Sequence, residues 1–172
     1  MFKRWYFSTI FRYFSTKRFI NSWYFSTFMA SQKIHLEKIK EHLQELQDAK
    51  AIGIESRPAT IGFHTSACAI DLLELYLHKA GTLELGGHIK HEWFKRPATG
   101  QKILPLVERK LSIDFEHKEE ILELLYVLED KRNKLIYGNS SKQELELVLR
   151  TFDEYKLLLK KLLQEKGETI EE

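Results

Sequence analysis

Apolar residues recur at helical spacing through most of the chain from residue 33 onward. The first apolar stripe consists of Ile34, Ile39, Leu43 and Leu46, among strong helix formers, and predicts a helix from about Lys33 to Lys50. The segment from Gly53 to Pro58 ends that helix, because glycine and proline interrupt helical structure.

A second helix is expected to start after Pro58, with Thr60 as its N-terminal cap, and to run to about Ala80, where Gly81 stops it. Its packing face is predicted to contain Ile61, Thr65, Cys68, Leu72, Leu75 and Tyr76. Residues 81–100 hold four glycines and one proline and read as a long connection, a length that often carries function.

Three further helices are predicted after this connection. A short one covers Ile103 to Leu111, with Pro105 tolerated only in its first turn. The two clearest run from Glu116 to Ile136 and from Ser140 to Glu165, separated by a Gly-Asn-Ser turn. Ser140 or Ser141 caps the last helix, and Glu144 stands three residues after Ser141, as in a capping box.

These elements predict an all-α fold, an antiparallel four-helix bundle with an additional short helix, over residues 33–166, because no stretch alternates like a β-strand. The content of 43% hydrophobic and 30% charged residues suits one globular domain. Cys68 is the one cysteine, so no intramolecular disulfide can form, and a reducing compartment such as the cytoplasm is expected. Residues 167–172 form a charged tail, and no apolar run approaches the roughly 20 residues that span a bilayer.

Residues 1–32 differ from the bundle in being aromatic and basic, with five Lys or Arg residues, no acidic residue, and a repeated Tyr-Phe-Ser-Thr motif. The net charge of the chain is +2, so the remainder is slightly acidic and does not favour nucleic-acid binding by bulk charge. Three interpretations of this extension compete: a start assigned too far upstream, with Met29 as the true start; an organelle-targeting segment; or an arm that contacts nucleic acid or membrane.

A charged residue interrupts the apolar stripe of the helix from Glu116. Arg132 follows Leu128 by four residues, on the side that should be buried. In a structural interpretation, the arginine stem lies on the core edge and the guanidinium reaches solvent or pairs with an acid such as Asp71 or Glu74. In a functional interpretation, the guanidinium faces a cleft and holds a phosphate with two hydrogen bonds.

The segment Arg132-Asn133-Lys134-Leu135-Ile136-Tyr137, at the end of a bundle helix, resembles the motif of the HEPN superfamily of small helical bundles, in which Arg and a polar residue precede a His. The second helix, from Gly62 through His64 to Leu75, and the order of elements are also similar over about Lys33 to Glu165. The resemblance implies RNA or nucleotide binding, homodimerisation, or pairing with a minimal nucleotidyltransferase in a toxin–antitoxin or defence system. In that case Arg132 stabilises a phosphate and Asn133 positions it.

Many HEPN proteins are metal-independent endoribonucleases, but here Tyr137 stands where the family has its histidine. A tyrosine ordinarily loses its proton near pH 10 and is a poor base at neutral pH, whereas a histidine titrates at about 6.5. The sequence therefore predicts a binding domain rather than a nuclease. The alternatives are an endoribonuclease in which His64 replaces the missing histidine, and a structural or interaction bundle without ligand chemistry.

Other candidate residues lie outside this motif. Residues 90–102 interleave cations with aromatic residues and form the best candidate nucleic-acid patch outside the N-terminal extension. The patch comprises Lys90, His91, Trp93, Phe94, Lys95, Arg96 and Lys102. The alternative is that the two aromatic residues fix this loop to the bundle. His64, Asp71, Glu74 and His78 share one helical face and could ligate a metal, but a solvated polar face is the preferred interpretation. No metal or cofactor is predicted, and Cys68 is expected in the core.

Overall fold

The computed structural model describes residues 32–171 except 85, 98–99 and 101–102. Within these residues the fold is all-α and contains no strand, which confirms the predicted class. The long helices are the first helix (residues 32–52), α2 (Pro58–Lys79), α4 (Lys118–Tyr137) and α5 (Lys142–Glu165); the short ones are η1 (Ile54–Ser56), η2 (His91–Phe94) and α3 (Leu106–Lys110). Residues 1–31 of the N-terminal extension lie outside the described residues, and so do the three interpretations of that extension. The predicted contact residue Lys102 lies outside them as well.

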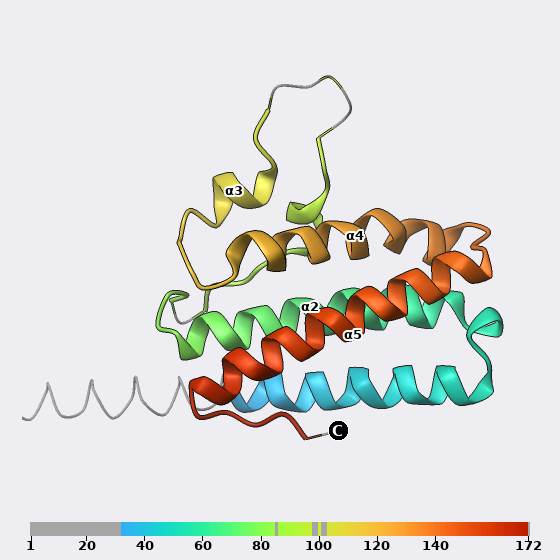
Figure 1. Cartoon of the computed structure of the whole chain (residues 1–172), viewed down its shortest axis with the longest axis horizontal. Helices are drawn as coiled ribbons and strands as arrows, with labels where there is room; N and C mark the ends of the chain where they lie inside the picture. The colour runs from blue at the N-terminus through green and yellow to red at the C-terminus, as the bar shows by residue number, and fades with distance from the viewer. Residues whose placement is uncertain (1–31, 85, 98–99, 101–102, 172) are drawn as a thin grey trace, which may run out of the picture.

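The long helices alternate in direction and form one antiparallel bundle (Figure 1). α2 packs against both α4 and α5, and the first helix lies along the side of the bundle opposite α4. The segment that carries η2 and α3 covers α4 from outside, with Phe94 buried. None of the helices in the described part of the chain has both the length and the apolar character needed to cross a bilayer.

Local sequence signals explain most helix boundaries. Ser141 caps α5, because its Oγ accepts a hydrogen bond from the Glu144 backbone N–H at 3.3 Å while the Glu144 carboxylate accepts one from the Ser141 N–H at 3.2 Å, which confirms the capping box. The prediction of Thr60 as a cap is wrong. Pro58 itself begins α2, since a proline at the first helical position loses no backbone hydrogen bond, and Thr60 lies inside the first turn.

A glycine sets how closely α2 approaches α4. A Cβ atom placed on Gly62 would lie 2.7 Å from the Leu135 Cβ and 3.3 Å from the Arg132 carbonyl oxygen. Only a residue without a side chain therefore permits this crossing, which fixes the turn of α4 that carries Arg132.

Cys68 is fully buried on α2, as predicted for a core residue. Burial raises the pKa of its thiol, so the thiolate needed for nucleophilic chemistry is disfavoured.

Candidate functional site

A cleft of about 350 Å³ lies beside the middle of α2. α2 contributes Asp71 and Glu74, the connection after α2 contributes His88, Lys90 and His91, and α4 contributes Arg132. The connection of residues 81–100 therefore forms one wall of the cleft. Lys38 of the first helix also lines the cleft, so four separate parts of the chain build the site, and only the tertiary fold brings them together.

Arg132 is partly buried and lines this cleft. Its Nη1 donates a hydrogen bond of 3.3 Å to the Oδ1 of the neighbouring Asn133. Among the described residues it forms no ion pair with a carboxylate, so the pairing with Asp71 or Glu74 that the structural interpretation allowed is not observed. The remaining N–H groups of the Arg132 guanidinium are therefore available to donate hydrogen bonds to a ligand in the cleft.

A buried carboxyl lies one turn before Arg132 on α4. Burial raises the pKa of Glu129, and a hydrogen bond from His91 and the nearby charges of Arg132 and Lys95 offset part of that rise. The His91 Nδ1 lies 3.1 Å from both carboxylate oxygens of Glu129. His91 therefore connects the cleft wall to α4 through its contact with the Glu129 carboxylate.

The other residues of the Arg132 motif do not meet in the cleft. Tyr137 is 81% exposed and Lys134 forms an ion pair with Glu144 at 2.8 Å. Neither lines the cleft, and nor does His64, whose Nδ1 lies 2.9 Å from the Nδ1 of His42. The two candidate bases, Tyr137 and His64, are thus separate from the lining that contains Arg132.

The predicted nucleic-acid patch divides into two groups. Lys90 and His91 line the cleft, whereas Arg96 pairs with Glu123 at 2.8 Å and with Asp130 at 3.5 Å. Trp93 packs partly buried against the core and Phe94 is buried, so both aromatics fix the loop to the bundle; Lys95 is exposed. Aromatic stacking on bases is therefore not available from Phe94.

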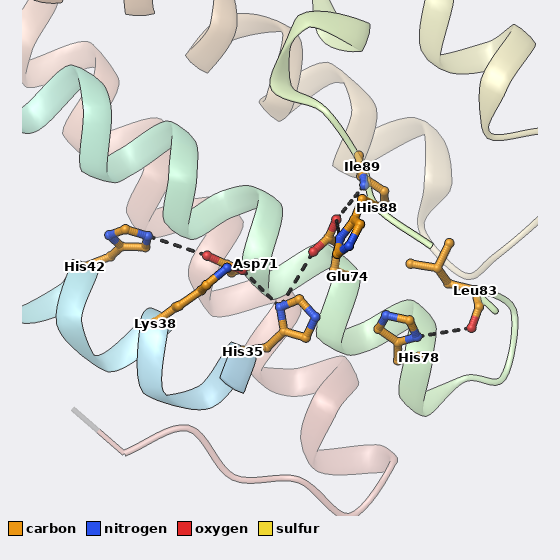
Figure 2. Close-up of polar contacts among 9 residues, drawn as sticks. All are labelled: His35, Lys38, His42, Asp71, Glu74, His78, Leu83, His88 and Ile89. Carbon is orange, nitrogen blue, oxygen red and sulfur yellow. Dashed lines mark hydrogen bonds and ion pairs between the residues drawn. The ribbon is translucent and has the colours of Figure 1, made fainter. Parts of the chain in front are cut away.

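A buried polar cluster lies between the first helix and α2 (Figure 2), and two of its members, Asp71 and Glu74, also line the cleft. The His35 Nδ1 is 3.0 Å from Asp71 Oδ1 and 3.6 Å from Glu74 Oε2, and all three residues are buried. The interpretation of Asp71, Glu74 and His78 as a solvated face is wrong, because the first helix covers this side of α2. His64 does not belong to this cluster.

Sequence reasoning missed His35 and His42 as partners of Asp71. They lie four residues before and three residues after the buried Ile39, so all three share one helical face, and that spacing was the available signal. Ile34, which the apolar stripe had placed inside, is 51% exposed. The buried face of the first helix thus combines His35 with apolar residues such as Ile39 and Leu43.

The two acids of the cluster respond differently to burial. Burial by itself would raise the pKa of Asp71, but hydrogen bonds from His35 and His42 lower it below its ordinary value. Burial raises the pKa of Glu74, and the hydrogen bond from the Ile89 N–H compensates only in part. Asp71 is therefore the more firmly ionised of the two.

We expect His64 to titrate below its ordinary pKa of 6.5, because burial and the charge of His42 both lower the pKa. Below pH 6.5 the unfolded chain then binds a proton that the folded chain does not, so stability falls as pH decreases toward the folded midpoint. Proton NMR titration of the imidazole signals should show this midpoint move upward in His42→Gln and remain unchanged in His117→Gln. A wild-type midpoint at or above 6.5 would contradict the expectation.

Fold and site together define an all-α bundle with a cleft formed by an arginine, a loop and a buried His-carboxylate cluster. Comparison of the chain with protein families, with curated proteins and with solved structures gave no match in any of the three.

Proposed function

We propose that the cleft binds a phosphate group of RNA, or of a nucleotide carried by a partner, with Arg132 as the principal contact. The observation that carries this proposal is a partly buried guanidinium that lines a cleft of about 350 Å³ and has no carboxylate partner within 4.0 Å among the described residues. Guanidinium groups bind phosphate through two parallel charge-assisted hydrogen bonds.

The surroundings of Arg132 support an anionic ligand. Lys38 and Lys90 are exposed and line the cleft together with Arg132, so three cations face the one exposed acid among the described lining residues, Glu92. The buried acids Asp71 and Glu74 already have partners, His35 and His42 for the first and the Ile89 N–H for the second. Asn133 accepts a hydrogen bond from Arg132 and so orients the guanidinium. The resemblance of the Arg132-Asn133 motif to HEPN proteins points to the same ligand class.

The test is a fluorescence-anisotropy titration of a labelled single-stranded RNA with the full chain. We expect Arg132→Ala to raise Kd at least tenfold, which corresponds to about 1.4 kcal/mol. Arg150→Ala, which removes an exposed arginine of α5 outside the cleft, should leave Kd unchanged. Competition by ATP would distinguish a nucleotide site from one that requires a polynucleotide. Equal affinities for wild type and Arg132→Ala, or no binding by either, would contradict the proposal.

We also propose an oligomeric state and a cellular context for this chain. Like the proteins it resembles, this chain would act as a homodimer in a reducing cytoplasm, in a toxin–antitoxin or defence system with a nucleotidyltransferase-type partner. Light scattering should then give twice the chain mass of 20.4 kDa. A mass equal to that of one chain would contradict the dimer. It would not bear on phosphate binding, which the RNA titration tests separately.

A further inference from the structure

The buried cluster beside the cleft has the donor atoms of a metal site. His35, Asp71 and Glu74 each offer one ligand atom, and these three atoms all lie within 4.8 Å of one another. The His35 Nδ1 is 3.0 Å from Asp71 Oδ1 and 3.6 Å from Glu74 Oε2. A zinc ion holds nitrogen and oxygen ligands at roughly 2.0–2.1 Å in a tetrahedron, which places two ligand atoms about 3.3 Å apart. The two separations here lie on either side of that value.

Each carboxylate directs one oxygen toward His35 and holds the other on a different partner (Figure 2). Asp71 Oδ2 lies 3.5 Å from His42 Nε2, which leaves Oδ1 facing His35. Glu74 Oε1 accepts a hydrogen bond from the Ile89 N–H, which leaves Oε2 facing His35. Partners that fix the outer oxygen of a ligating carboxylate are a regular feature of metal sites, because they orient the inner oxygen.

The helices supply these donors on a rigid frame. Asp71 and Glu74 are three residues apart on α2 and so lie on one face, while His35 comes from the neighbouring first helix. All three residues are at most 7% exposed. Two carboxylates at that depth require compensating positive charge. Lys38 supplies little of it, since its Nζ is 3.9 Å from Asp71 Oδ1 and its side chain is 54% exposed.

The cluster is also accessible from one side. Asp71 and Glu74 line the cleft, so an ion and a water molecule can reach them from solvent. The exposed His88, with its Nδ1 3.8 Å from Glu74 Oε1, lies at the same opening. Zinc sites that also hold water or substrate have this arrangement, with three protein ligands and a fourth position open to a cleft.

We infer that His35, Asp71 and Glu74 bind one divalent transition-metal ion, with zinc as the best fit and a fourth position open to the cleft. An imidazole nitrogen among the donors favours zinc and its neighbours over magnesium or calcium, which prefer oxygen ligands alone. The inference goes beyond the proposed phosphate binding and does not depend on it.

Calorimetric titration of the chelator-treated full chain with zinc chloride tests the inference. We expect one zinc ion per chain with a micromolar or lower Kd, and no comparable heat with magnesium chloride. His35→Gln and Asp71→Asn, which nearly conserve side-chain size, should each weaken binding at least 100-fold. His42→Gln, which removes a partner of a ligand, should weaken it about tenfold. His117→Gln, at an exposed histidine paired with Glu120, is the matched control and should bind like wild type.

A second measurement covers variants that fail to fold. Cobalt(II) added to the wild-type chain should give the visible absorption of a four-coordinate ion with nitrogen and oxygen ligands, and zinc should displace it. Absence of zinc uptake by the wild-type chain would overturn the inference. Zinc uptake that persists in folded His35→Gln and Asp71→Asn would also overturn the inference. Loss of zinc uptake in His64→Gln would overturn it too, since His64 is not a ligand in this site. RNA binding measured in chelator should be retained, so failure of one proposal is distinguishable from failure of the other.

Discussion

Gly62→Leu is expected to destabilise the folded chain by about 3 kcal/mol, the upper end of the usual cost of overpacking. Even the Cβ of the new side chain would lie 2.7 Å from Leu135 Cβ and 3.3 Å from the Arg132 carbonyl oxygen. Backbone and Cβ atoms cannot rotate away, so α2 and α4 must separate. The higher helix propensity of leucine offsets only about 1 kcal/mol of this cost. Urea unfolding followed by circular dichroism measures the change.

Matched variants separate steric clash from a general effect of added volume. Ala59→Leu enlarges an exposed position of the same helix and should change stability by less than about 0.5 kcal/mol. Gly62→Ala should fall between Gly62→Leu and wild type. Because the clash acts on the turn that carries Arg132, Gly62→Ala should also weaken RNA binding under conditions in which the chain remains folded. A stability equal to wild type in Gly62→Leu would show that the helices do not cross this closely.

Tyr155→Ala is expected to cost about 4 kcal/mol, as for other large aromatic truncations in a core. Tyr155 is fully buried on α5, and its hydroxyl donates a hydrogen bond of 2.7 Å to the carbonyl oxygen of Ala69 on α2. This contact links the two helices two residues before Asp71. Tyr155→Phe keeps the ring and removes only the hydroxyl, so it should cost about 1 kcal/mol.

The difference in stability between Tyr155→Ala and Tyr155→Phe separates the contribution of ring packing from that of the hydrogen bond. Leu157→Ala, at a position of α5 that is 72% exposed, provides the control and should be close to neutral. Equal losses in Tyr155→Phe and Tyr155→Ala would mean that the hydroxyl rather than the ring carries the stabilisation. A loss below about 1 kcal/mol in Tyr155→Ala would contradict the buried position of this side chain.

Local signals in the sequence were sufficient for the four long helices, but not for the short helices η1 and η2. The capping box at Ser141 and Glu144 acts within one turn, and the apolar periodicity of α5 reports its buried face directly. The cap of α2 was misplaced at Thr60 because the rule for a capping side chain competes with the preference of proline for the first helical position, and here proline prevails. The short helix likewise begins at Leu106 rather than at the predicted Ile103, because Pro105 is its N-cap residue and not part of its first turn. Such errors move a boundary by about three residues and leave the element intact.

The candidate site was only partly predictable. Arg132 was found because a charge interrupted an apolar stripe, and the structure places it in the cleft. The spacing of Asp71 and Glu74 places them on one face of α2 but predicts that this face is solvated. Their cover, the first helix with His35 and His42, comes from a distant part of the sequence. No periodicity within α2 can report what another helix places against it.

The sequence by itself determined the helical class, the order of the long helices and one unusual arginine, because spacing, caps and breaks act over a few residues. The tertiary structure alone decided which charges are buried together and where space remains. Those properties depend on how closely α2 approaches its neighbours, at Gly62 on one side and at His35 on the other, and such approach distances are set by packing across the whole bundle.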